Sequence, residues 1–599
     1  AMLCFGRNFL ARKLPVGKKI RVAGPFARGK YGEIQSGAFV FEAAETELPS
    51  HDFGLILPIY ALGGNLTQTL LRKALKSALA RYAFNLRNEL PQDILRERRI
   101  PDKAKCLGHV HFPPSLKTAF RIRKALIFEE FFHLQIAVAK RKLRLKTVSP
   151  VDRRWDDTLP RKLIDTLPFQ LTPDQDLALK DIKNDVNRPE TMLRLIQGEV
   201  GSGKTLVAFI ACLGVIGSGR QAAFMAPTEL LARQHADNAA RLLEPIGIRI
   251  AFLSGEVAVK ARKPLIEALR AGEIDLIIGT HALFSSDIGF KNLAMIIIDE
   301  QHRFGVDQRR ALADKGESPD ILALSATPIP RTIALTAFGD MDVSSIATMP
   351  KGRLLIETHL ARMGNEAKVY SFVRRELQAG NRAYFVYPLI EESDKSNLKD
   401  AENMFSYLSS QVFPDFRGAL IHSRIEEEEK RRIMMEFKDG RLDFLTATSV
   451  VEVGVDVPEA TCMVVEHAER FGLSALHQLR GRVGRGTHQS YCFLVYGEPL
   501  TEEGKNRLLT MKNTNDGFKL AEEDMKFRGP GDMAGVKQSG FLKLTIANPV
   551  RDLPLLLEAR DEAQRVMAAD PLLMREDNKN IKDIFTSFPP FNEDLLSTL

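Results

Sequence analysis

Cysteine is scarce in this sequence and irregularly placed. The 599 residues include only five cysteines, which are Cys4, Cys106, Cys212, Cys462 and Cys492, and no two of them form a C-x-x-C pair. Zinc ribbons, iron–sulfur clusters and disulfide frameworks need paired or regularly spaced cysteines, so the sequence excludes these classes. Scattered cysteines indicate a reducing, cytosolic location.

Long apolar runs are also absent. No window of about 18 uncharged apolar residues occurs, so we expect no bilayer-spanning segment and no membrane partner. No acidic or histidine cluster is left unexplained by the motifs below, so nothing supports a nuclease. The chain opens with Ala, and its first residues lack the charged and apolar regions of a leader peptide. We therefore expect a truncated or incompletely represented chain.

Positive charge is concentrated at the amino end. Residues 1–150 contain 27 lysines and arginines against 11 acidic residues, whereas the whole chain has a net charge of +8. A localised excess of cations favours contact with a polyanion, and nucleic acid is the polyanion we expect, because phosphate contacts release counterions. The alternative is a basic surface that is merely solvated, and charge alone does not separate the two.

The middle of the chain has the texture of parallel β-sheets. From about residue 167, short apolar runs alternate with amphipathic helical stretches, as strands buried on both faces of a sheet require. Six such runs lie between residues 192 and 327, and five lie between residues 383 and 496. We predict two tandem α/β domains here.

The flanking segments differ. Short β-type runs at 19–24 and 39–42, separated by glycine-rich turns, predict part of a small antiparallel barrel. Apolar residues at helical spacing among many lysines and arginines predict basic helices at 67–88 and 116–146. The last hundred residues are charged and mostly helical. The predicted domain boundaries are 1–60, 61–150, 151–350, 351–500 and 501–599.

Residues 198–205 (GEVGSGKT) match the phosphate-binding pattern G-x-x-x-x-G-K-[ST]. A predicted strand precedes the pattern and a predicted helix follows it, which is the context that the pattern requires. Backbone N–H groups would wrap the β-phosphate of ATP, Lys204 would reach the β and γ oxygens, and Thr205 would ligate Mg²⁺. The other loop residues expected to contact the nucleotide are Gly198, Glu199, Val200, Gly201, Ser202 and Gly203.

A second acidic element follows about a hundred residues later. The apolar run 294–298 ends in Asp299 and Glu300. Two acids after a strand can simply begin a helix, but together with the phosphate-binding loop they indicate a Walker B element. Asp299 would hold Mg²⁺ through water, and Glu300 would orient and activate the attacking water.

Four segments, in order and at suitable spacing, resemble motifs II, III, V and VI of superfamily 2 helicases. They are DEQH from residue 299, LSATPIPR from 324, ATSVVEVGVDVP from 447 and QLRGRVGR from 478. The longer stretches DEQHRFGV, TPIPRTIALTAFGDMD and EHAERFGLSALHQLRGRVGRG resemble the RecG family of bacterial branched-DNA translocases. This resemblance extends over nearly the whole chain. It implies an α/β fold with two tandem RecA-like parallel-sheet motor domains, preceded by a partial OB-type wedge domain and a helical linker, and followed by a C-terminal helical hairpin.

The helicase resemblance implies further residues at the nucleotide. Arg482 and Arg485 are spaced to act as arginine fingers from the second domain, with Gln478 as a water or phosphate contact. A loop that merely binds phosphates is the alternative. The resemblance also implies that Gly454 and Asp456 contact the nucleotide.

Residues 167–175 resemble the adenine-reading element of such motors. This resemblance implies that Phe169 stacks on the base and that the amide of Gln175 contacts it at two atoms. A plain turn with a helix cap at Thr172 is the alternative.

Other segments resemble the parts of these motors that contact DNA or couple its movement to hydrolysis. Motifs Ia and Ib grip the phosphate backbone through hydroxyls and helix-start amides without reading bases. The hydroxyls of motif III could equally be turn caps. Residues 515–540 resemble the translocation motif. The residues implied in these roles are Thr228, Thr280, His281, Ser325, Thr327, Thr448, Arg528 and Gln538.

Taken together, the resemblance implies an ATP- and Mg²⁺-dependent translocase on double-stranded DNA. It would remodel stalled forks, Holliday junctions and R-loops in DNA repair and recombination, as a monomer in the bacterial cytoplasm near the nucleoid, with branched DNA and single-stranded-DNA-binding protein as partners. The alternatives are a translocase of the transcription–repair coupling type and a non-enzymatic junction-binding scaffold. Intact motor residues disfavour the scaffold, and the wedge and linker resemblance disfavours the coupling type.

Overall fold

The computed structural model describes residues 2–3, 16–24, 26–29, 32–35, 40–43, 55–64, 66–145, 154–255, 259–300, 315–325, 341–349, 354–388, 394–422, 424–448, 457–528 and 544–587. The chain divides into two compact units. The N-terminal unit comprises Ala1–His133, Leu555–Ala559 and Leu572–Ile584. The motor unit comprises Leu134–Pro554, Arg560–Pro571 and Phe585–Leu599.

A seven-stranded sheet forms the centre of the first motor domain. Its strand order is β12-β6-β11-β10-β7-β9-β8, and every neighbouring pair is parallel. All six residues of β10 (LAMIII) are buried, as expected for a strand covered by helices on both faces. The strands are β6 Leu193–Gly198, β7 Gln221–Met225, β8 Ile250–Leu253, β9 Leu276–Gly279, β10 Leu293–Ile298, β11 Asp320–Ser325 and β12 Asp342–Ile346.

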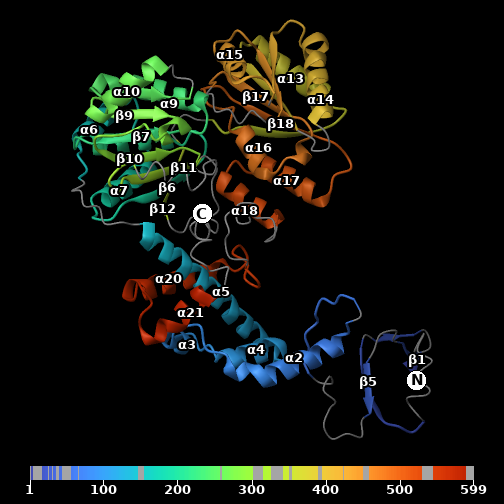
Figure 1. Cartoon of the computed structure of the whole chain (residues 1–599). Coiled ribbons are helices and arrows are strands. Elements are labelled where there is room, and N and C mark those ends of the chain that lie inside the picture. The colour runs from blue at the N-terminus through green and yellow to red at the C-terminus, as the bar shows by residue number, and fades with distance from the viewer. Residues whose placement is uncertain are drawn as a thin grey trace. The chain divides into compact units, whose positions relative to one another are not determined.

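Helices cover both faces of this sheet (Figure 1). One apolar cluster unites buried residues of α6, α7, α8 and α9 with one face of the strands, and a second unites α10 with the other face. The helices are α6 Thr158–Thr166, α7 Pro173–Val186, α8 Lys204–Ile216, α9 Glu229–Leu243 and α10 Val259–Ala271, with the 3-10 turns η2 Glu244–Ile246 and η3 His281–Phe284.

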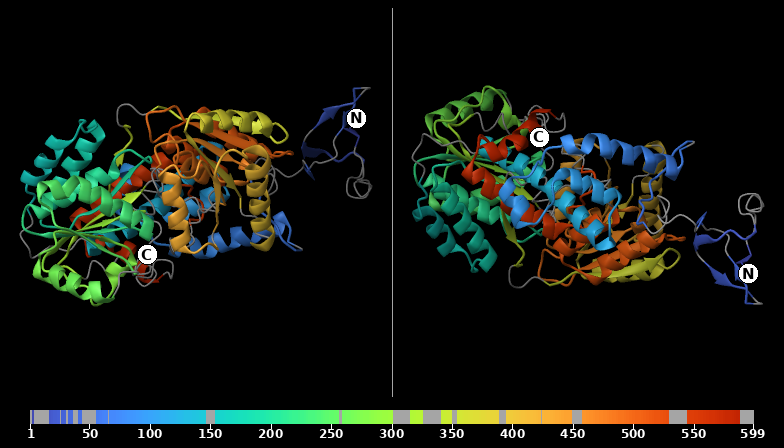
Figure 2. Two further views of the ribbon diagram at one scale, coloured as in Figure 1. Left: turned by 90° about the horizontal axis from the view of Figure 1, so that it is seen from above. Right: turned by 90° about the horizontal axis from the view of Figure 1, so that it is seen from below.

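The second motor domain repeats this plan with a six-stranded parallel sheet of order β13-β18-β17-β14-β16-β15. Helix α13 and the end of α14 cover one face, and α15 to α18 cover the other. The layers of both domains can be followed from above and below in Figure 2. The strands are β13 Glu357–Arg362, β14 Arg382–Tyr387, β15 Gly418–Ile421, β16 Phe444–Thr448, β17 Ala460–Val465 and β18 Tyr491–Tyr496. The helices are α13 Glu366–Gln378, α14 Asp394–Tyr407, α15 Glu427–Lys438, α16 Leu473–Arg480, α17 Glu502–Asn513 and α18 Gly517–Arg528, with η5 Leu408–Val412 and η6 Ala468–Arg470.

The predicted α/β class with two parallel sheets is confirmed. Each of the apolar runs predicted as strands forms one, from β6 to β11 and from β14 to β18. The edge strands β12 and β13 were not predicted.

The N-terminal unit contains two small sheets in its first residues. Strands β2 Ile20–Ala23 and β5 Val40–Ala43 pair antiparallel. In the other sheet β4 Ile34–Gln35 pairs antiparallel with β3 Ala27–Arg28 but parallel with β1 Met2–Leu3. The two runs predicted at 19–24 and 39–42 form β2 and β5 and pair antiparallel as predicted, whereas β1 and β4 pair in parallel.

Helices make up the rest of this unit. Those predicted at 67–88 and 116–146 are present as α2 with η1 and as the 30-residue α5. The elements are α2 Gln68–Tyr82, η1 Ala83–Asn85, α3 Gln92–Glu97, α4 Lys103–His111, α5 Leu116–Leu145, α20 Leu553–Ala569, η7 Glu576–Asn578 and α21 Lys579–Ser587. Parts of α5 and α20 belong to the motor unit. Within the described ranges, no helix combines the length and the apolar character that a bilayer span needs.

Candidate functional site

The phosphate-binding loop lies between β6 and α8, as its sequence predicts. Gly201 and Gly203 have φ angles of +82° and +85°, a backbone conformation that favours glycine. The Lys204 ammonium donates hydrogen bonds to the carbonyl oxygens of Gly198 (2.8 Å) and Glu199 (2.7 Å). Successive N–H groups of such a turn and the start of α8 suit an anionic phosphate.

Lys204 lies in a charged but buried environment. Burial lowers the pKa of Lys204 to about 8, although the negative charges of Asp299 and Glu300 oppose this shift. The positive charge of Arg485, from the second motor domain, lowers it further. The structure therefore brings the predicted lysine, both Walker B acids and one predicted arginine finger to the same place.

Asp299 follows the central strand β10, whose last residue Ile298 pairs with Met225 of β7 and Ala323 of β11. Its Oδ1 accepts a hydrogen bond from the backbone N–H of Glu300 (3.0 Å). Its Oδ2 lies 2.8 Å from Nε2 of His235 on α9. Both carboxylate oxygens are thus held in place.

These contacts keep Asp299 ionised. Burial alone would raise the pKa of Asp299, but the hydrogen bond from His235 and the charge of Lys204 hold it below its usual value. Glu300 has a φ of +49°, a conformation that costs energy for a residue with a side chain and is often found at functional sites.

Motif VI reaches the phosphate-binding loop from the second motor domain. A Cβ atom added at Gly481 would lie 3.5 Å from Cβ of Val200. Gln478 lies on α16, and the half-buried Arg482 and Arg485 follow it in the next turn. The Arg485 Nε–H donates to the Gly481 carbonyl (3.2 Å).

Arg480 of the same motif has a different role, which the sequence reasoning missed. Its guanidinium is 2% exposed and donates to the carbonyl oxygens of Met511 and Thr514, both at 2.9 Å. It holds the end of α17 against α16. Its position four residues after the buried Leu476 places it on the inner face of the helix, which was the available signal.

The predicted adenine-reading residues differ in exposure. Phe169 is 53% exposed, whereas Gln175 is 2% exposed. Gln175 and Thr172 form a reciprocal capping box at the start of α7. The Gln175 amide also donates to the Ser202 carbonyl (2.8 Å), so in this conformation Gln175 supports the phosphate-binding loop.

The residues predicted to contact DNA also differ in exposure. Thr228 caps α9, where its hydroxyl accepts from the Leu231 N–H, and His281 is exposed. Thr280, Ser325 and Thr448 are buried, with exposures of 3%, 3% and 1%. A direct phosphate contact by these three would need a different conformation. Thr327, Gly454, Asp456, Gln538 and the side chain of Arg528 lie outside the described residues.

The C-terminal hairpin of α17 and α18 connects to both halves of the ATP site. The Gly517 N–H at the start of α18 donates to Glu199 Oε1 of the phosphate-binding loop (2.6 Å). The Ser474 hydroxyl on α16 donates to Asp524 of α18 (2.8 Å). The hairpin therefore contacts the phosphate-binding loop of the first motor domain and helix α16 of the second.

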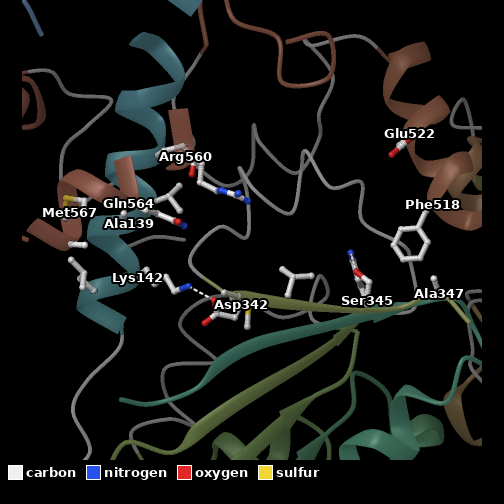
Figure 3. Close-up of a pocket in the computed structure, with 17 residues that line it drawn as sticks. Ala139, Lys142, Asp342, Ser345, Ala347, Phe518, Glu522, Arg560, Gln564 and Met567 are labelled. Atoms are coloured by element: carbon white, nitrogen blue, oxygen red, sulfur yellow. Dashed lines mark hydrogen bonds and ion pairs between the residues drawn. The ribbon is translucent and has the colours of Figure 1, made fainter. Parts of the chain in front are cut away.

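A separate cavity of about 820 Å³ lies between β12, α18 and the motor-unit ends of α5 and α20 (Figure 3). Lys142 of α5 forms an ion pair with Asp342 of β12 on one side (2.6 Å), and Phe518 and Glu522 of α18 lie on the other. None of the nucleotide contacts predicted from the sequence is among the described residues that line it.

Comparison with known proteins assigns the chain to a family. Residues 172–336 match the DEAD/DEAH box helicase model, residues 368–487 the helicase conserved C-terminal domain, and residues 514–586 the C-terminal part of domain 3 of the ATP-dependent DNA helicase RecG. The chain is 48% identical to the ATP-dependent DNA helicase RecG of Treponema pallidum, covering 94% of this chain and 84% of that protein. The chain belongs to the RecG family. The RecG proteins of Borreliella burgdorferi (46% identity, 94% and 81% coverage) and Bacillus subtilis (42%, 95% and 82%) agree.

A solved RecG structure also matches. This RecG, bound to a three-way DNA junction, is 39% identical and has a TM-score of 0.72, covering 93% of this chain and 73% of that one. The chain is thus an ATP-dependent DNA helicase, and its use of ATP follows from the family. This confirms the predicted enzyme and excludes a non-enzymatic scaffold.

Proposed function

We propose that this RecG-family helicase uses ATP with Mg²⁺ to translocate on duplex DNA and to remodel branched DNA, as in stalled-fork reversal and the branch migration of Holliday junctions during repair and recombination. The observation that carries this proposal is the contact of motif VI with the phosphate-binding loop, which brings the charge of Arg485 to Lys204. A junction as substrate is supported by the related RecG that was solved with one.

The residues at the site fit a nucleotide with a divalent cation. The glycine turn and the Lys204 ammonium supply donors to phosphate oxygens, and Thr205 with the ionised Asp299 supplies oxygen ligands. When bound, Mg²⁺ neutralises charge on the β- and γ-phosphates. Glu300 takes the proton of the attacking water, while Arg482 and Arg485 stabilise the charge that develops on the γ-phosphoryl group.

Because the arginines and the lysine come from different domains, hydrolysis requires the domains to be together. The α17–α18 hairpin contacts the phosphate-binding loop through Glu199 and helix α16, which leads into motif VI, through Ser474, so closure and opening displace it. We assign the conversion of this displacement into movement along duplex DNA to residues 515–540, with Arg528 and Gln538.

The test is the ATPase rate without DNA, with single strands, with linear duplex and with a three-way junction. We expect the highest rate with the junction and strand separation only there. Lys204→Ala should abolish hydrolysis, because the phosphate clamp is lost, while junction binding persists. Equal stimulation by linear duplex and junction would contradict the branched-DNA assignment, and retained hydrolysis in Lys204→Ala would contradict the ATP site.

A further inference from the structure

His235 makes a contact that the catalytic roles described above do not use. It lies two turns into α9 and is 5% exposed. Its Nε2 is 2.8 Å from Asp299 Oδ2, and its ring packs on Phe224 with centroids 4.7 Å apart. Phe224 in turn packs on Phe209 of α8, the helix that begins at Lys204. The imidazole is therefore fixed between the Walker B carboxylate and the apolar core.

The surroundings also indicate which ring nitrogen donates the hydrogen bond to Asp299. The His235 Nδ1 is buried, and no described residue forms a hydrogen bond with it. A proton on Nδ1 would leave a buried donor unsatisfied, whereas a lone pair there costs less. The proton consequently belongs on Nε2, where it is donated to the ionised Asp299.

Helix α9 links this contact to other parts of the motor. Its cap is Thr228, a predicted DNA contact. In its first turn Glu229 lies 3.5 Å from Arg431 of α15, and Leu230 packs against the apolar cluster of the second motor domain. The helix that holds the Walker B carboxylate thus also contacts the second motor domain.

We propose that His235 is a positioning residue that fixes the carboxylate of Asp299 for the divalent cation and fastens it to α9. The proposal rests on the proposed ATP site. Donors behind a metal-binding carboxylate orient it, and their removal typically lowers metal affinity or activity roughly 10- to 100-fold. His235 would act in this way without touching nucleotide or cation.

The test measures the affinity of the whole chain for a fluorescent ADP analogue, first with EDTA and then over a series of Mg²⁺ concentrations. His235→Phe and His235→Leu remove the donor, whereas His235→Gln keeps an N–H donor at similar reach. Asp237→Asn, an exposed change on the same helix, is the matched control. Melting temperatures identify any variant that does not fold. If one of the two donor-free variants does not fold, the other one provides the measurement.

With EDTA we expect all variants to bind ADP like the unchanged chain, because the phosphate-binding loop is intact. The Mg²⁺ concentration needed for half of the added affinity should rise roughly 10- to 100-fold in the donor-free variants, and much less in His235→Gln and Asp237→Asn. An unchanged Mg²⁺ dependence in a folded donor-free variant would overturn the proposal, and so would His235→Gln behaving like His235→Phe. A wrong assignment of the ATP site itself would be recognised separately. In that case Lys204→Ala would still bind ADP in the presence of EDTA as tightly as the unchanged chain.

Discussion

At the scale of single residues, the ionisation of Lys204 makes nucleotide binding depend on pH. Burial lowers the pKa of Lys204 from 10.5 to about 8, so the ammonium is progressively lost above pH 8. We expect the affinity for ADP to fall by up to about tenfold per pH unit above pH 8, because the protonated fraction of Lys204 falls tenfold with each unit above its pKa. A fluorescence titration at each pH measures this, with adenosine, which has no phosphates, as the matched control ligand.

A flat ADP profile up to pH 9.5, or an equal fall for adenosine, would contradict this assignment. The effect of the same group on stability has the opposite sign. Between pH 8 and 10.5 the unfolded chain holds the lysine proton and the folded chain does not, so this group makes the free energy of unfolding rise with pH.

Glu300 allows a second prediction at this scale. Glu300→Gln removes the general base but leaves Lys204 and Asp299 in place, so ATP should still bind while turnover falls by about 10²- to 10⁴-fold. Single-turnover hydrolysis with a parallel binding measurement checks this. Glu273→Gln, an exposed change in the same domain, is the control and should keep the original rate. Unchanged turnover in Glu300→Gln would place the base elsewhere.

Four residues that contiguous motifs predicted for the site lie near one another in the structure, and their catalytic roles stay predictions. Lys204, Asp299, Glu300 and Arg485 lie close enough to influence one another, as the strand–loop–helix context implies. His235 could not be found in this way, because 64 residues separate it from Asp299 and only the parallel pairing of β7 with β10 brings the α9 connection to Asp299. A polar residue on a buried helix face was the sole local signal.

At the scale of secondary-structure elements, burial explains which strands were predictable. Central strands such as β10 are buried at every position and give continuous apolar runs. Strand β13 (ETHLAR) lies at the edge of its sheet and has only one buried residue, and β12 (DVSSI) is similarly mixed. Both strands lie at a sheet edge and carry polar residues, so no continuous apolar run reveals them. The opposite edge strands, β8 (IAFL) and β15 (GALI), are apolar and were predicted.

The prediction at the scale of elements concerns helix α18 and its contact with the phosphate-binding loop. Glu199 accepts the Gly517 N–H at the start of the helix, so the phosphate-binding loop and the hairpin move together. Glu199→Ala removes this acceptor, whereas Glu199→Gln retains one. A hydrogen bond to a charged group contributes about 1.5–3 kcal/mol. Its loss should therefore reduce the coupling of ATP hydrolysis to DNA unwinding more than it reduces the rate of hydrolysis. We expect the number of junctions unwound per ATP to fall at least about tenfold in Glu199→Ala and less in Glu199→Gln.

Parallel assays of ATP hydrolysis and three-way-junction unwinding measure that ratio. Ser474→Ala, which removes the contact of α16 with Asp524, provides a second route to the same effect. If hydrolysis and unwinding fall together in both variants, the hairpin supports the ATP site rather than transmitting its state.

At the scale of the whole molecule, the described cations of residues 1–150 include both paired and exposed side chains. Lys103 pairs with Glu89 and Glu129, and Arg98 pairs with Glu558, so these cations stabilise the N-terminal unit. Helix α2 differs, because none of its residues is buried. Its exposed cations are Lys73, Lys76 and Arg81. Composition alone showed the excess of charge, but only the structure separates the paired cations from the exposed ones.

The exposed cations of α2 lead to the last prediction. If they contact phosphates, the triple variant Lys73→Gln, Lys76→Gln and Arg81→Gln should weaken junction binding and reduce the magnitude of the log–log salt slope by roughly 0.9 for each lost contact. Junction and linear-duplex affinities measured from low to high salt give these slopes. A matched set on the motor domains, Lys180→Gln, Lys263→Gln and Lys368→Gln, removes the same charge from exposed positions elsewhere. Non-specific attraction by net charge would change both sets alike, whereas contact through α2 lowers the slope only in the first. Equal slopes in the two sets would show that α2 presents a solvated surface and that DNA is held by other parts of the chain.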